Sequence, residues 1–100
     1  MSLEERFIDL TKVSPEELLF KKVQGGSLSI QVDGEASITL MGKHSELETF
    51  YNVGVINLTT LGKQSSITGA GIYLCAVTGM DQVKLEATGT GKVHIKVLGD

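Results

Sequence analysis

The chain has 100 residues and a formal net charge of −3. A chain of this length forms one domain with a modest core, and this charge argues against the strongly basic surface that binds nucleic acid or anionic membranes. Twelve glycines, one proline and no tryptophan favour a compact, turn-rich β domain over a helical bundle. We therefore expect one domain, residues 1–100, with neither a nucleic-acid nor a membrane partner.

The first 26 residues are expected to form an arm and a short helix. The apolar residues Phe7, Ile8 and Leu10 predict an irregular strand or arm. The sequence Ser14-Pro15-Glu16-Glu17 then has the pattern of a capping box with proline at the first helical position. This pattern predicts a helix of about two turns from Pro15 to Lys21, ended by Gly25-Gly26.

Residues 27–100 are expected to form the β-rich core of the domain. Apolar and polar residues alternate over residues 27–32 and again over 36–40, on either side of Asp33-Gly34. A two-residue turn there would place apolar residues opposite polar ones, because side chains alternate between the two faces of a strand. Either the loop has an odd number of residues, Asp33–Glu35, or the chain crosses from one sheet to another at this point.

The middle of the chain predicts a polar loop at residues 42–46, strands at 47–52 and 55–61, and a second loop at 62–66. With the segments on either side, about seven or eight strands result. This number is typical of a two-sheet antiparallel β-sandwich, similar to a jelly roll.

The segment between Gly71 and Gly79 is apolar on both alternating faces, so neither face of a strand here belongs in water. One face is expected in the domain core, and the other is expected to pack on a second copy of the chain. Alternation alone does not say which row of side chains faces outward. The interface prediction therefore covers both rows: Ile72, Tyr73, Leu74, Cys75 and Val77.

The last segments, residues 83–87 and 93–97, alternate in the same way around Gly89-Thr90-Gly91. A three-residue loop with Gly91 in the left-handed conformation predicts a hairpin that joins two matching apolar rows. The same register would place the outward-facing His94 opposite Glu86 and Lys84 opposite Lys96.

No catalytic, metal-binding or cofactor-binding arrangement stands out. His44, His94 and Cys75 do not have the spacing of zinc ligands, and the single cysteine cannot form an internal disulfide. Ser65 and Ser66 lack a nucleophile-elbow motif. The acidic residues of the middle segments, Glu46, Glu48 and Asp81, are interpreted as solvated. We expect no enzyme activity and no cofactor. The lone cysteine and the lack of an early apolar segment of signal-peptide length suit synthesis in the cytoplasm.

Glycines and alternating apolar residues follow a recognisable succession in the second half of the chain: residues 51–58, 66–73, 77–79, 83–85 and 91–97. This succession resembles the small β-sandwich modules of bacteriophage and prophage virion proteins, such as head-fibre, decoration and tail-appendage subunits. The resemblance implies a non-enzymatic structural subunit of a virion, often a trimer, that contacts itself and other virion proteins. A glycan-binding or receptor-binding module is the alternative, although the chain has few aromatic residues to form a sugar platform.

Overall fold

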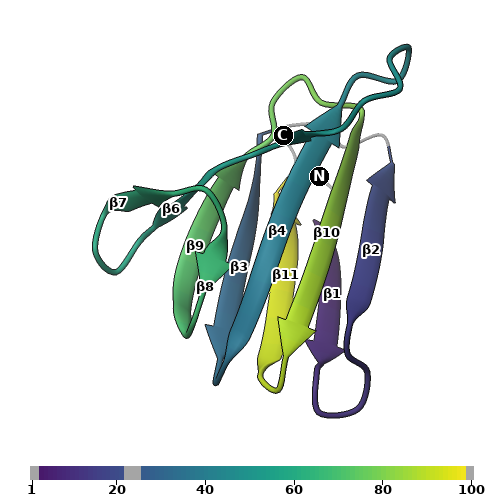
Figure 1. Ribbon diagram of the computed structural model, residues 1–100. Coiled ribbons are helices and arrows are strands. Elements are labelled where there is room, and N and C mark those ends of the chain that lie inside the picture. Colours follow the sequence, from purple (N-terminus) through teal and green to yellow (C-terminus); the bar gives the residue numbers. More distant parts are fainter. Residues whose placement is uncertain (1–2, 22–25, 99–100) are drawn as a thin grey trace.

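The computed structural model describes residues 3–21 and 26–98, and this part of the chain forms two packed antiparallel sheets (Figure 1). Its strands are β1 (Leu3–Asp9), β2 (Glu16–Lys21), β3 (Ser27–Asp33), β4 (Ala36–Lys43), β5 (Tyr51–Asn52), β6 (Val55–Asn57), β7 (Gly62–Gln64), β8 (Ile67–Thr68), β9 (Gly71–Ala76), β10 (Gln82–Gly89) and β11 (Lys92–Leu98). The predicted antiparallel β-sandwich is confirmed, with eleven strands in place of seven or eight.

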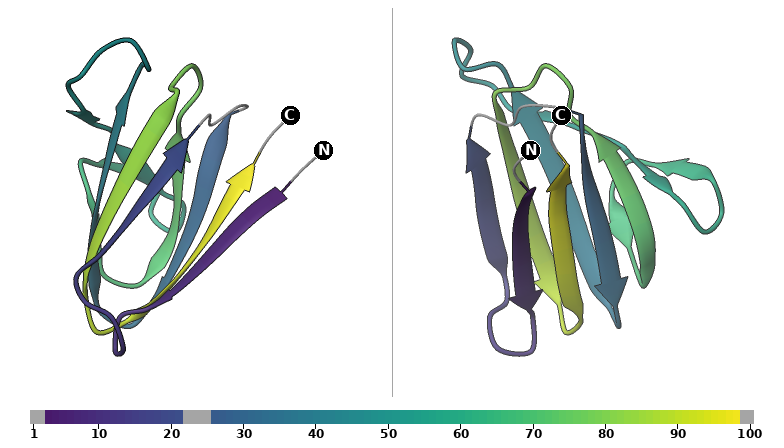
Figure 2. Two further views of the ribbon diagram at one scale, coloured as in Figure 1. Left: turned by 90° about the vertical axis from the view of Figure 1, so that its right-hand side faces the viewer. Right: turned by 180° about the vertical axis from the view of Figure 1, so that it is seen from behind.

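The six-stranded sheet has the order β1-β11-β3-β9-β6-β7. The five-stranded sheet has the order β2-β10-β4-β5, and β8 also pairs with β4. Figure 2 shows the two sheets close together at the end where β3 turns into β4 and β10 into β11, and further apart at the opposite end. Most strands pair with strands that are distant in the sequence.

The core between the sheets is apolar. Each long strand contributes alternate residues, so that the buried row of one sheet packs on the buried row of the other. No buried polar or charged residue occurs among the residues described. The fully buried side chains are those of Leu28, Ile30, Val32, Ile38, Leu40, Ile67, Tyr73, Cys75, Val77, Val83, Leu85, Ala87, Val93 and Ile95.

The helix predicted from Pro15 to Lys21 is wrong: Glu16–Lys21 form β2, an edge strand that pairs with β10. The capping pattern is a signal from neighbouring residues alone. In the structure, a contact with a distant strand decides the outcome: Phe20 is 4% exposed and lies in the core opposite Val83. A two-turn helix is marginal without tertiary support, so pairing with a long partner strand outweighs the local signal. The expected arm at residues 7–10 is mostly strand β1, and the Gly25 part of the expected helix stop lies outside the described residues.

The predicted C-terminal hairpin is also wrong, because β10 and β11 belong to different sheets. The chain crosses the sandwich at Thr90-Gly91 and does not fold back within one sheet. Glu86 lies opposite Glu17 and Thr39, so it does not face His94, and Lys84 does not face Lys96. The left-handed glycine of this link is Gly89, with φ of +126°, and not Gly91.

Asp33-Gly34 is a second crossing between the sheets. This is one of the two arrangements that the alternation of apolar residues in the flanking strands allowed. The two crossings lie against each other. The carbonyl oxygen of Glu35 accepts hydrogen bonds from the backbone N–H of Thr90 at 3.0 Å and of Gly91 at 2.7 Å. A Cβ atom on Gly91 would lie 2.4 Å from the Asp33 carbonyl oxygen, so glycine is required by this close approach.

The middle strands are shorter than predicted. Only Tyr51–Asn52 and Val55–Asn57 are strands within the expected segments 47–52 and 55–61, and part of the expected loop at 62–66 is strand β7. The Asn57 side chain accepts hydrogen bonds from the N–H groups of the residues that follow, and this ends β6 in a turn. β6 and β7 form a hairpin, residues 54–66, that we call the side hairpin. It extends from the edge of the six-stranded sheet (Figure 1).

Candidate functional site

The structure determines which row of β9 faces the core. Tyr73, Cys75 and Val77 are 1%, 0% and 0% exposed, respectively, and lie between the sheets. These three residues of the predicted interface are therefore core residues, and are not available to a partner. Ile72 and Leu74 point away from the core, and Ile72 is 42% exposed. Within the described chain, only one of the two apolar faces of β9 is thus covered.

The outward row of β9 continues onto the side hairpin. Leu74 lies opposite Ile56 of β6, and the N–H of Leu58 donates a hydrogen bond to the Ile72 carbonyl oxygen at 2.8 Å. Ile56 is 38% exposed and Leu58 is 42% exposed. We call this surface the apolar face, and it consists of Ile56, Leu58, Ile72, Leu74 and Ala76.

Few charged side chains adjoin the apolar face. At its outer edge, Lys63 of β7 lies opposite Ile56. On the other side of the apolar face the neighbouring side chains are polar but uncharged. The strand beside it, β3, presents Ser27, Ser29 and Gln31 opposite Ala76, Leu74 and Ile72. The other charged residues of the same sheet surface lie further away, on β11 and β1. There Lys92 faces Asp9, Lys96 faces Glu5, and the His94 Nε2 lies 3.0 Å from the Glu5 carboxylate. This pattern resembles an interface, in which the centre is depleted of charge and the rim is polar.

The outer surface of the five-stranded sheet is different. Its two neighbouring strands β2 and β10 present Glu17 beside Glu86, and Leu19 beside Lys84. The Lys84 ammonium group lies over the Phe50 ring, 4.8 Å from its centre. Charged groups therefore divide the apolar residues of this surface, which makes it a poorer match to the centre of an interface.

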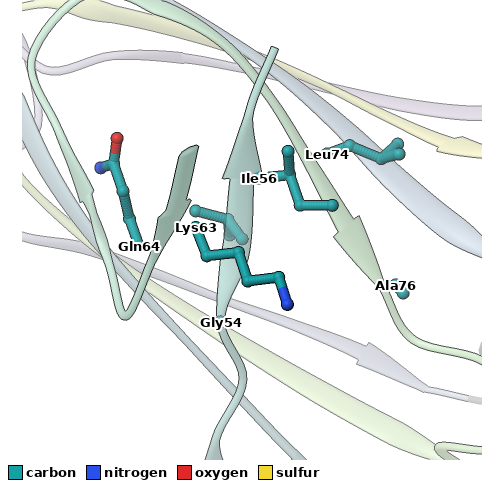
Figure 3. Close-up of a pocket in the computed structure, with 7 residues that line it drawn as sticks. Gly54, Ile56, Lys63, Gln64, Leu74 and Ala76 are labelled. Atoms are coloured by element: carbon teal, nitrogen blue, oxygen red, sulfur yellow. The ribbon is translucent and has the colours of Figure 1, made fainter. Parts of the chain in front are cut away.

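A hollow of about 220 Å³ lies on the apolar face between β9 and the side hairpin, as Figure 3 shows. Ile56, Leu74 and Ala76 supply its apolar lining, and Lys63 and Gln64 supply polar groups. The Gln64 side chain is held in place, because its oxygen accepts a hydrogen bond from the Asn57 amide at 3.1 Å and its nitrogen donates to the Ser66 carbonyl oxygen at 3.0 Å. We call this the face hollow.

The residues that carry chemistry are not gathered into a site. Among the described residues, no group of three or more His, Cys, Asp or Glu side chains is placed to hold a metal ion. Burial raises the pKa of the Cys75 thiol to about 11, which makes it a poor nucleophile at neutral pH. The Asp81 carboxylate accepts a hydrogen bond from the Ser45 N–H at 2.8 Å, while Glu46 and Glu48 are exposed.

Sequence reasoning found the β9 part of the apolar face but missed the side hairpin. The available signal was the alternation of Val55, Asn57 and Thr59 with Ile56 and Leu58, which places the last two on one side of a strand. Reading residues 55–61 as one long strand hid the turn. The described part of the chain holds no helix long and apolar enough to span a membrane.

Comparison with known proteins gives the fold and little beyond it. No protein-family description matches the chain, and no curated protein sequence matches it. Among solved structures, the chain is similar to the crystal structure of the SPBc2 prophage-derived protein YomS, with a TM-score of 0.68 and 19% sequence identity. That match covers 97% of this chain and 95% of the other. The two proteins therefore share an architecture over nearly their whole lengths.

Proposed function

We propose that this protein is a non-enzymatic, self-assembling structural subunit on the surface of a phage or prophage particle. The observation that carries the proposal is the apolar face, a surface of Ile and Leu side chains that the described chain leaves partly exposed, with Lys63 at its edge. The resemblance to virion modules and the similarity in fold to the prophage-derived YomS support the particle as its location. Other virion proteins would be further partners.

The proposed interface fits the size of this molecule. A stable interface takes about 800 Å² from each partner. The chain exposes 5981 Å² in total, so such an interface would cover roughly an eighth of its surface. The outer surfaces of β3, β9 and β6, with the side hairpin, offer a continuous region for it. We expect three copies in the assembly, the number that the resemblance implies.

Replacing Ile72 by Asp tests the proposal, because it puts a charge at the centre of the apolar face. Leu19→Asp is the matched control, since Leu19 is 45% exposed on the outer surface of the other sheet and Ile72 is 42% exposed. Light scattering coupled to size exclusion should give the mass of an oligomer for the unmodified chain and for Leu19→Asp. Ile72→Asp should give a folded monomer. A monomeric unmodified chain at micromolar concentration, or an oligomer unaffected by Ile72→Asp, would contradict the proposal.

Glycan binding is the second candidate, and the exposure of Phe7 favours it. Phe7 is 64% exposed on β1 and lies opposite His94, which lies opposite Gln31. An aromatic ring beside polar side chains is a platform on which a sugar ring can stack. Binding to a glycan array that disappears in Phe7→Ala, while the oligomer mass stays unchanged, would favour this second function.

A further inference from the structure

The tip of the side hairpin is a turn with several hydrogen bonds of its own. Besides the two N–H groups that donate to the Asn57 side-chain oxygen, the Leu61 N–H donates a hydrogen bond to the Asn57 carbonyl oxygen at 2.6 Å. The Thr60 hydroxyl oxygen accepts another from the Gly62 N–H at 3.2 Å. Hydrogen bonds to Asn57, which precedes this four-residue turn, and to Thr60, which lies within it, thus hold the turn in shape.

This turn presents Leu61 to solvent. Leu61 is 77% exposed, more than any other large apolar residue among those described, and its φ is +63°. The left-handed conformation is unfavourable for a side chain with a Cβ atom, and glycine or asparagine is usual there. Neither local conformation nor burial within the described chain explains a leucine at this position. A strained, exposed residue at a fixed site is a candidate for contact with a partner.

The same chain has an apolar hollow that matches a leucine side chain. We call it the end hollow, because it lies at the end of the sandwich where β4 stops. Its apolar lining consists of Leu47, Tyr51, Val53 and Met80, and its volume is about 310 Å³. A buried apolar cavity of about 150 Å³ is large enough to bind benzene. The end hollow is therefore wide enough for the four side-chain carbons of a leucine.

The charges beside the two features are complementary. Lys63 is the one charged residue of the side hairpin, and it is exposed. Glu46 and Glu48 flank Leu47, a lining residue of the end hollow, in the sequence, and both are also exposed. Neither carboxylate forms an ion pair with another described residue. Lys43, which also lines the end hollow, has its ammonium group engaged in a hydrogen bond to the Leu47 carbonyl oxygen at 2.7 Å.

Leu61 and the end hollow cannot meet within one chain. Figure 1 shows the side hairpin on one flank of the sandwich and the loop between β4 and β5 at the opposite upper corner. We propose that Leu61 of one copy inserts into the end hollow of a second copy, with Lys63 facing Glu46 and Glu48. The inference rests on the proposed self-assembly. It specifies a contact between two different surfaces, which gives a closed ring when the rotation between copies closes.

A first test separates assembly from folding. Leu61→Gly removes the inserted side chain and relieves the unfavourable conformation, so the thermal midpoint of the variant should be at least that of the unmodified chain. Its assembly should weaken at least tenfold in a dilution series. Leu19→Gly, a change of the same type on the other sheet, should leave assembly unchanged. Undiminished assembly of Leu61→Gly would overturn the inference.

A second test locates the contact. A chain carrying both Leu61→Cys and Leu47→Cys should form disulfide-linked multimers on mild oxidation, while a chain carrying Leu61→Cys and Leu19→Cys should not. Charge reversal by Lys63→Glu should weaken assembly, and adding Glu46→Lys and Glu48→Lys should restore it. If the unmodified chain assembles and Ile72→Asp abolishes assembly, but the Leu61–Leu47 pair does not cross-link, the insertion is wrong and the proposed function stands. A monomeric unmodified chain would reject both.

Discussion

At the scale of single residues, the inward-facing side chains of β9 place a hydroxyl group and a thiol group in the apolar core. Tyr73 is 1% exposed, yet its hydroxyl reaches the Gly69 carbonyl oxygen at 3.1 Å and the Thr68 carbonyl oxygen at 3.3 Å. Two positions along the strand, the Cys75 thiol has no exposed surface. Both residues were candidates for an interface from the sequence, and both instead stabilise the fold.

Removing the Tyr73 hydroxyl should destabilise the protein modestly. Tyr73→Phe keeps the buried ring but deletes the hydrogen bond, so the free energy of unfolding should fall by about 1 kcal/mol in urea denaturation. Tyr51→Phe is the matched control, because Tyr51 is 72% exposed and its hydroxyl is solvated. A loss of equal size in both variants would show that the Tyr73 hydrogen bond contributes nothing.

The buried thiol of Cys75 should make stability depend on pH in the alkaline range. Burial raises its pKa from 9.0 to about 11, so the unfolded chain ionises first. The contribution is complete below pH 9 and is lost as the pH rises to 11, amounting to about 2 to 3 kcal/mol.

The control for this pH dependence is Cys75→Ala, in which lysines and tyrosines still titrate. The unmodified chain should lose more unfolding free energy than Cys75→Ala between pH 9 and pH 11, when both are followed by urea denaturation. Parallel curves for the two proteins would contradict the assignment.

At the scale of elements, the two crossings between the sheets form one unit. The Glu35 carbonyl oxygen binds the N–H groups of both Thr90 and Gly91, and the Leu10 N–H donates to the Gly91 carbonyl oxygen at 2.9 Å. Three segments far apart in the sequence therefore meet at one end of the sandwich. This contact fixes how β3, β4, β10 and β11 are placed relative to each other.

Adding a methyl group inside this unit should be costly. Gly91→Ala brings a Cβ atom against backbone atoms of Asp33 and Glu35, which cannot move without displacing both crossings. We expect a loss of about 3 kcal/mol or more, the range of severe overpacking. Gly79→Ala separates crowding from conformation, since Gly79 has φ of +84° but no atom within 4 Å of its added Cβ. It should lose only about 1 to 2 kcal/mol. Equal losses in thermal or urea unfolding would contradict the crowding argument.

Alternation along single strands was enough to predict the β class, the sandwich and the apolar character of β9. It was not enough to predict which strands pair. The hairpin expected between residues 83–87 and 93–97 was wrong because alternation is the same whether a short link folds back within a sheet or crosses between two sheets. The helix at Pro15 was wrong because its signal is local, and the partner strand β10 lies more than sixty residues away in the sequence.

At the scale of the whole molecule, stability should be uneven. β3 and β11 are paired on both sides, and so are β10 and β4, whereas β7 is a three-residue edge strand that pairs only with β6. Local opening is easiest where few buried contacts and few paired neighbours hold the backbone. The side hairpin should therefore be the less stable part of the described fold.

Amide hydrogen exchange should show this difference. In dilute solution, amides of β3, β4, β10 and β11 should exchange slowest and those of β7 fastest. Raising the protein concentration should slow exchange in β6, β7 and the outer half of β9, because assembly covers them. Exchange in the side hairpin that is independent of concentration across the range in which the mass of the oligomer changes would contradict the proposed interface.

The pairing order has a consequence for how the chain acquires its fold. β1 pairs with β11 and β2 with β10, so the first two of the described strands to be synthesised have as partners the last two. Only β4 with β5 and β6 with β7 are neighbours both in sequence and in a sheet within the described fold. The long chain segments between such partner strands must be brought together before the strands can pair. The entropy lost in this step slows folding. β1 and β2 thus stay without their partner strands until residues 82–98 leave the ribosome, and both sheets are completed only after that.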